Sequence, residues 1–275
     1  MIELPPGASS RVAIVIPARY QSSRYPGKPL ALLTGCTGVG KPLIQRSLEA
    51  ACEVRGAASV HVATDDNRIA EAVRGIGGAV IMTPPECANG TERVAAALPQ
   101  LPSEAEIIIN FQGDGLLTPS VLVEALIAHM LSDPDCQVAT VAVGCSATAY
   151  AHLIADQAAG RVGGTTAVLD AKSNALYFSK RVLPHIPPGD KREQDPPVLL
   201  HLGLYAYRRS ALEQYRSWPE TDLERIEGLE QLRFLVHRTP VHVVRADPPD
   251  WDTIELNNPS DKAPIEAILK ARAII

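Results

Sequence analysis

Residues 12–30 read VAIVIPARYQSSRYPGKPL, and this stretch decides the fold class. Its first five residues are apolar and mostly β-branched, which predicts the first strand of a sheet. The loop that follows carries three cations and two serine hydroxyls between its prolines and its glycine. In open α/β sheets, ligands bind in loops of this kind, at the carboxyl ends of the strands.

The loop is suited to wrapping a polyphosphate. Its backbone N–H groups and hydroxyls would hold phosphate oxygens, while Arg19 and Lys28 would neutralise the charge that builds on a leaving pyrophosphate. On these residues alone, a solvated basic loop stays open as the alternative.

Strand and helix patterns alternate along the chain after this stretch. Strands are predicted over 60–63, 79–82 and 107–111, and helices over 43–54, 67–74, 91–98 and 119–131, with Asp65 and Asp66 as a helix N-cap. This alternation indicates βαβ units, and therefore an α/β, Rossmann-like, mostly parallel sheet flanked by helices. The loops after Ile16, Ala63, Met82 and Phe111 are expected to line the site.

The alternation of strand and helix patterns changes after a strand predicted over 138–143. A β-like stretch at 165–169 and a proline-rich loop at 184–197 indicate a small subdomain or dimerisation insert, 145–200, within a single domain spanning 1–275. A strand (202–207), one strong helix (223–236), another strand (241–246) and a final helix (264–273) are then expected.

Composition excludes several classes of protein. The chain of 275 residues is 46% hydrophobic with a formal net charge of -5, which is ordinary for a soluble globular protein and lacks the basic surface that nucleic acid requires. Without a signal-like N-terminus or an apolar run of roughly 20 residues, we expect a cytoplasmic protein that does not bind membranes. The five cysteines are scattered and odd in number, which is typical of reduced thiols.

Residues 35–41 match the G-x-x-x-x-G-K pattern of a P-loop. A P-loop lysine is followed by Ser or Thr, which holds Mg²⁺, and the loop opens a helix directly after a strand. Here Pro42 removes both the hydroxyl and an amide donor. The segment is therefore predicted to be a surface hairpin.

Two other groups of residues suit nucleotide chemistry. Residues 89–93 follow a strand and start a helix, so their amides and the Thr91 hydroxyl can meet an acceptor-rich base. Asp114 and Asp252 each follow a predicted strand, and two carboxylates suffice to hold Mg²⁺ on a triphosphate; taken alone, each is equally well a turn aspartate. The histidine spacings do not indicate zinc, and neither a GxSxG elbow nor a Cys–His pair supports covalent catalysis.

Taken together, these pieces resemble the 3-deoxy-manno-octulosonate (Kdo) cytidylyltransferases, or CMP-Kdo synthetases. The resemblance spans most of the chain and is carried by IPAR (16–19), PGKPL (26–30), GKPLI (40–44), VATD (62–65), GTER (90–93), NFQGD (110–114), ALYFS (175–179), HLG (201–203) and LERIE (223–227). It implies a nucleotide-diphospho-sugar transferase fold and a homodimer. It also implies Mg²⁺-assisted attack of an acidic acceptor's oxygen on the α-phosphorus of CTP, with pyrophosphate as the leaving group.

The resemblance also assigns roles to residues. It implies catalytic roles for Lys28, Arg19 and Asp114, and a metal site at Asp114 and Asp252. The nucleotide would be bound by Ala18, Arg19, Ser22, Lys28, Thr64, Asp65, Asn89, Gly90, Thr91, Arg93 and Gln112, and the acceptor by Gln112, Lys180, His201, Tyr205, Glu224 and Glu227.

Departures from the family pattern fall mainly in the acceptor half. Gly115-Leu116 stands where the family has Glu-Pro, Lys180 replaces an arginine, a lysine is missing from 165–170, and the segment after Asp252 differs. Lysine and arginine bind anions with different geometry. We therefore lean towards a small phosphonate acceptor such as phosphonoformate, which would place the enzyme in phosphonate biosynthesis. A Kdo-like sugar acid, a non-catalytic nucleotide-binding regulator and a nucleotidyltransferase for another base remain the alternatives.

Overall fold

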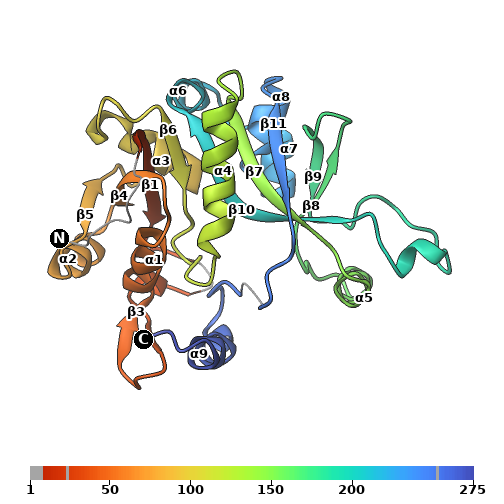
Figure 1. Ribbon diagram of the computed structural model, residues 1–275, viewed down its shortest axis with the longest axis horizontal. Coiled ribbons are helices and arrows are strands. Elements are labelled where there is room, and N and C mark those ends of the chain that lie inside the picture. The colour runs from red at the N-terminus through yellow and green to blue at the C-terminus, as the bar shows by residue number, and fades with distance from the viewer. Residues whose placement is uncertain (1–8, 23–24, 252–253) are drawn as a thin grey trace. The chain divides into compact units, whose positions relative to one another are not determined.

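The computed structural model describes residues 9–22, 25–251 and 254–275. The chain divides into a first unit, Met1–Ile127 with Pro249–Ile275, and a second unit, Ala128–Pro248. The predicted insert, 145–200, lies inside the second unit. Figure 1 allows the elements of each unit to be followed by label.

The sheet of the first unit is built from parallel strands in the order β6 (Ile107–Asn110), β1 (Ser9–Ala18), β4 (Ala57–Thr64) and β5 (Ala79–Met82). Residues 12–16 of β1 are completely buried, as a continuous apolar run in a parallel strand requires. The predicted parallel α/β arrangement is confirmed. Because β1 and β6 are parallel, the polar loops that follow them lie at the same edge of the sheet.

Among the described residues, five α-helices belong wholly or partly to the first unit. They are α1 (Leu43–Cys52), α2 (Asn67–Gly75), α3 (Gly90–Ala97), α4 (Ser120–Ser132), which continues into the second unit, and α9 (Lys262–Ala271). Short 3₁₀ turns cover Lys28–Leu30, Leu98–Gln100 and Pro259–Asp261. Asp66 is the N-cap of α2, because its side chain accepts a hydrogen bond from the backbone N–H of Arg68 at 2.9 Å.

The P-loop-like segment is a hairpin. Strands β2 (Leu32–Thr34) and β3 (Gly40–Pro42) pair antiparallel, so the predicted surface hairpin is confirmed. The C-terminal helix α9 lies against it, near the lower edge of Figure 1, and Glu266 accepts a hydrogen bond from the backbone N–H of Thr34 at 2.8 Å. Leu33 and Leu269 share one buried apolar cluster at this contact.

The second unit holds a mixed sheet in the order β11 (Val241–Ala246), β7 (Val138–Gly144), β10 (Leu199–Arg208), β8 (Thr166–Leu169) and β9 (Ala175–Ser179). The first pair is parallel and the others are antiparallel. Its helices are α5 (Ala147–Ala158), α6 (Arg209–Ser217), α7 (Asp222–Glu227) and α8 (Leu232–Val236), with a 3₁₀ turn at Lys191–Glu193.

The prediction of one helix over 223–236 was wrong. The chain forms α7 and α8 instead, because Gly228 adopts the left-handed conformation, with φ of 62°, and ends α7. A second difference is α5, which the sequence reading left without a helix. Ser146 starts it by accepting a hydrogen bond from the backbone N–H of Ala149 at 3.1 Å.

Cys36, Cys52, Cys136 and Cys145 are free thiols. Burial raises the pKa of both Cys52 and Cys136 to about 11, which keeps these two sulfurs protonated and unreactive at neutral pH. Within the described parts of the chain, no helix is both long enough and apolar enough to cross a bilayer.

Candidate active site

A cavity of about 240 Å³ lies in the first unit, where the loops after β1 and β6 meet the start of α3. Eight of the eleven predicted nucleotide residues line it, namely Ala18, Arg19, Ser22, Lys28, Asn89, Gly90, Arg93 and Gln112, together with Asp114. The sequence reading missed Leu43 and Asn257 in its wall. Asn257 lies in the segment after Asp252 that departs from the family pattern, so the resemblance did not mark it.

The loop after β1 is folded back on itself by a tight turn. Gly27, in the left-handed conformation with φ of 72°, donates its backbone N–H to the Tyr20 carbonyl at 2.9 Å. A Cβ at Gly27 would lie 3.1 Å from the Tyr20 ring, so the close approach also favours glycine. The turn brings Lys28 to the cavity, at the start of a 3₁₀ turn with Pro29.

Lys28 and Asp114 form an ion pair inside the cavity. The Lys28 Nζ lies 2.5 Å from the Asp114 Oδ2, and the two side chains are only 19% and 16% exposed. Arg19 is exposed, and its guanidinium reaches the Ala88 carbonyl at 3.5 Å. With Arg93, the described cavity wall therefore holds three cations and the Asp114 carboxylate, which suits an anion that carries a metal ion.

The residues present fit Mg²⁺ in part. Asp114 would supply one carboxylate oxygen ligand, since Mg²⁺ binds through one or two carboxylates plus phosphate oxygens and water. The other predicted ligand, Asp252, lies outside the described residues. Across the part of the chain that is described, His, Cys, Asp and Glu side chains nowhere gather in threes as a ready-made metal cluster. Any metal at Asp114 would therefore depend on the triphosphate for further ligands.

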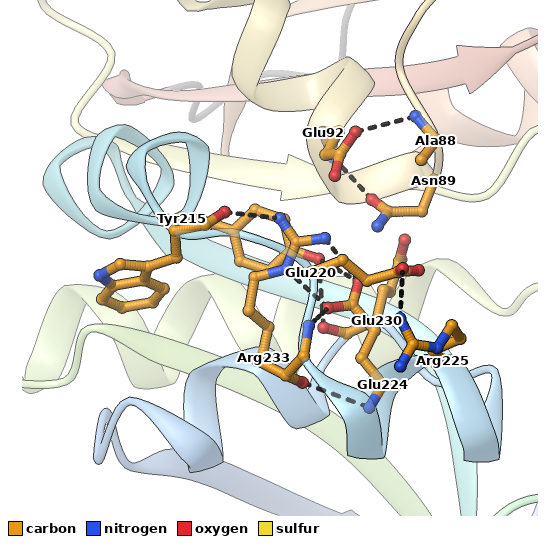
Figure 2. A network of polar contacts seen from close by, with 11 residues as sticks. Ala88, Asn89, Glu92, Tyr215, Glu220, Glu224, Arg225, Glu230 and Arg233 are labelled. Atoms are coloured by element: carbon orange, nitrogen blue, oxygen red, sulfur yellow. Dashed lines mark hydrogen bonds and ion pairs between the residues drawn. The ribbon is translucent and has the colours of Figure 1, made fainter.

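Helix α3 begins at the cavity with a reciprocal cap. The Asn89 side chain accepts from the backbone N–H of Glu92 at 2.8 Å, and the Glu92 carboxylate accepts from the backbone N–H of Ala88 at 2.8 Å, as Figure 2 shows. This fixes the entry of the chain into α3. Gly90, the first residue of the helix, is thereby held in the cavity wall.

Behind this helix start, Arg93 is almost completely buried, at 2% exposure. Its Nη1 donates to the Thr83 hydroxyl at 2.7 Å and lies 3.3 Å from the Asp65 Oδ1. Asp65 therefore touches Arg93 rather than lining the cavity. Thr64 and Thr91 are fully buried and also stay out of the wall. The sequence reading missed Thr83, although it expected the loop after Met82 to contribute.

The predicted acceptor residues other than Gln112 lie in the second unit. Glu224 is 5% exposed, and both of its carboxylate oxygens accept from the Arg233 guanidinium, at 2.7 and 2.6 Å. It also accepts from the Tyr215 hydroxyl at 3.2 Å (Figure 2) and from the backbone N–H of Thr221 at 3.3 Å. These contacts engage the Glu224 carboxylate in holding α7 and α8.

The side chain of Glu227 is hydrogen-bonded to the backbone of Lys180. The Glu227 carboxylate accepts from the Ser179 hydroxyl at 2.8 Å and from the backbone N–H of Lys180 at 3.0 Å. The Lys180 ammonium lies against Gly228, where an added Cβ would stand 2.7 Å from Nζ. The turn that breaks the predicted long helix thus makes room for Lys180.

His201 is held as a neutral ring. Its Nε2 lies 2.9 Å from the Thr140 Oγ1, and because that hydroxyl donates to the Leu204 carbonyl at 2.6 Å, its oxygen is left to accept from the ring N–H. The ring packs edge-on to Phe178 and is tilted against the buried Tyr205. Desolvation of the ring lowers the pKa of His201 to about 3. At neutral pH His201 therefore offers hydrogen bonding and shape, but no positive charge.

The chain is similar to several known proteins. A family described as cytidylyltransferase matches residues 13–241. The chain is 40% identical to the 3-deoxy-manno-octulosonate cytidylyltransferase of Maricaulis maris, over 94% of this chain and 97% of that protein. It is 38% identical to the 8-amino-3,8-dideoxy-manno-octulosonate cytidylyltransferase of Shewanella woodyi, over 94% of this chain and 98% of that protein.

A solved structure is similar as well. It is a CMP:2-keto-3-deoxy-manno-octonic acid synthetase complexed with CTP, with a TM-score of 0.81 at 35% identity, covering 95% of this chain and 99% of that chain. The family match spans most of the chain, and the likeness of fold extends over nearly all of it. The chain therefore belongs to the cytidylyltransferase family, among the 3-deoxy-manno-octulosonate cytidylyltransferases, and is a nucleotidyltransferase.

Proposed function

We propose that this protein transfers CMP from CTP to a 3-deoxy-manno-octulosonate sugar acid and releases pyrophosphate. The observation that carries the proposal is the cavity in which Lys28, Arg19 and Asp114 meet the capped start of α3. In this arrangement, side chains that can bind a metal-bound triphosphate lie beside a helix start that can bind a planar base.

In the proposed reaction, the acceptor's hydroxyl oxygen bonds to the α-phosphorus and the bond to the β-phosphate oxygen breaks. The hydroxyl proton passes to solvent, and pyrophosphate leaves. Lys28 and Arg19 neutralise the charge that develops on the departing phosphates. Asp114 and Asp252 would hold Mg²⁺, which supplies charge neutralisation on the phosphate oxygens when bound. The rest of the rate comes from in-line positioning of the two reactants.

The acceptor is inferred from the relatives. The two curated proteins cited above are named for octulosonate sugar acids, one of which carries an 8-amino group. The leaning towards phosphonoformate finds no support among these relatives, and the departures at Gly115 and Lys180 are then variation within a sugar-acid enzyme. The 8-amino sugar is the second candidate acceptor. The homodimer that the resemblance implies and the cytoplasmic location expected from the sequence remain predictions.

The experiment measures pyrophosphate release with Mg²⁺ and Kdo, using CTP, ATP, GTP or UTP in parallel. We expect release with CTP at least tenfold faster than with any other nucleotide. Equal rates with several nucleotides would contradict a cytidylyltransferase. Binding of CTP without release, for Kdo and for its 8-amino analogue, would favour the non-catalytic alternative.

A further inference from the structure

A buried hydroxyl on α1 reaches the turn that carries Asp114. Ser47 is completely buried, and its Oγ lies 2.8 Å from the Gly113 carbonyl oxygen and 3.2 Å from the Leu43 carbonyl oxygen. A helical serine commonly donates to the carbonyl four residues earlier, which here is that of Leu43. The single hydroxyl proton has the shorter contact with Gly113, 66 residues away in the sequence.

The turn is held on its other side by the end of β1. A Cβ at Gly113 would lie 2.6 Å from the Pro17 carbonyl oxygen, so only glycine lets the two loops approach this closely. Within the turn, the backbone N–H of Gly115 donates to the Gln112 carbonyl at 2.9 Å. Ser47 thus contacts the carbonyl of the peptide group that joins Gly113 to Asp114, and Pro17 lies close to the Gly113 Cα.

The carbonyl of Gly113 and the N–H of Asp114 belong to one rigid peptide plane. A rotation of that plane moves the Cα of Asp114 and with it the carboxylate, which lies 2.5 Å from Lys28 in the cavity. Misplacement of a reacting group by about 1 Å costs on the order of 100-fold in rate, so even a small rotation has a measurable effect.

We propose that Ser47 is a positioning residue, which acts through the Gly113 carbonyl to set the direction of the Asp114 carboxylate and thereby its affinity for a divalent metal on the nucleotide. The proposal rests on the proposed function, in which Asp114 is a metal ligand. Ser47 is not among the residues that line the cavity, and its effect passes through the backbone.

The test compares Ser47→Ala and Ser47→Cys with Ile44→Val. Ile44 lies on the same helix and is 1% exposed, so its shortening lowers stability while leaving the Gly113 hydrogen bond intact. The cysteine variant fills the space of the serine with a weaker donor. It keeps the proposal testable if the alanine variant does not fold.

Binding of Mn²⁺ to the enzyme with CTP, without acceptor, is followed by electron paramagnetic resonance. We expect about 5–10-fold weaker Mn²⁺ binding in Ser47→Ala, as the loss of one hydrogen bond implies, with a smaller loss in Ser47→Cys. Hydrogen exchange in residues 110–118 should be faster in both serine variants than in Ile44→Val.

Mn²⁺ affinity in both serine variants equal to that of Ile44→Val would overturn the proposal. An inactive wild type that still binds Mn²⁺ and CTP would contradict the proposed function instead, while the Mn²⁺ titration would continue to decide the role of Ser47. The two failures are therefore distinguishable.

Discussion

Replacement of Lys28 by methionine separates its two roles. Its ammonium occupies the Asp114 carboxylate at 2.5 Å, so a metal ion that approaches the nucleotide-free enzyme must displace it. Methionine keeps an unbranched side chain that is one atom shorter, and it removes the charge. We expect Lys28→Met to bind divalent metal more tightly than wild type in the absence of CTP, and yet to turn over more slowly.

The magnitude follows from the burial of the pair. Exposed ion pairs contribute about 0–1 kcal/mol and breaking a buried one costs about 3–5 kcal/mol. With side chains 19% and 16% exposed, the Lys28–Asp114 pair lies between these limits, so we take about 1–2 kcal/mol, equivalent to about 5–30-fold in metal affinity. Loss of the cation from the leaving pyrophosphate should lower kcat by about 100–1,000-fold.

The assay is the shift of the melting temperature with Mg²⁺ concentration, followed by steady-state kinetics with CTP. Lys41→Met is the matched control, because the Lys41 Nζ pairs with Glu49 at 2.9 Å and does not line the nucleotide cavity. Equal Mg²⁺ affinity in wild type, Lys28→Met and Lys41→Met would refute the argument that Lys28 competes for Asp114. A kcat of Lys28→Met near that of wild type would refute its catalytic role.

Three further predictions concern single residues. Asp114→Asn should abolish Mg²⁺-dependent turnover while calorimetry without metal still detects CTP binding, and near-wild-type rates would remove Asp114 from the mechanism. Arg233→Met leaves the Glu224 carboxylate buried without its cation, so urea denaturation should show a loss of about 3–5 kcal/mol, whereas an unchanged midpoint would mean that Glu224 is not needed for the fold. The pKa of His201 is lowered to about 3 from 6.5. The stability that this shift contributes is fully present above pH 6.5 and is lost as pH falls towards 3, by at most about 1.4 kcal/mol per pH unit. His201→Gln should flatten that part of the stability–pH curve, and an unchanged curve would contradict a neutral His201 in the fold.

The sheet was predictable from the sequence because buried parallel strands consist of continuous runs of apolar residues. The apolar residues 12–16 of β1 and 107–109 of β6 are completely buried. The predicted bounds 79–82 and 241–246 also coincide with β5 and β11, although these two strands are only partly buried. Helical breaks are harder to predict, because the apolar spacing of 223–236 continues through Gly228 and hides the turn there. The start of α5 depends on the Ser146 cap, a signal too common in sequences to be decisive.

Within the candidate site, the sequence predicted the loops better than the contacts. Motifs placed Lys28, Gln112 and Asp114 at the cavity because each follows a strand end on the same edge of the sheet. That Arg93 of α3 is buried against Thr83 and Asp65 depends on how the helix meets the loops after β4 and β5 in space. Such pairings, like the contact between Ser47 and Gly113, have no signature in local sequence.

The most direct test of the central claim is mass-spectrometric identification of the product formed from CTP and Mg²⁺ with Kdo, its 8-amino analogue and phosphonoformate, each supplied alone. We expect a CMP adduct of an octulosonate sugar acid together with pyrophosphate, and no adduct with phosphonoformate. A CMP adduct of phosphonoformate alone would contradict the proposed acceptor, and the absence of any adduct despite CTP binding would contradict the proposed transfer itself.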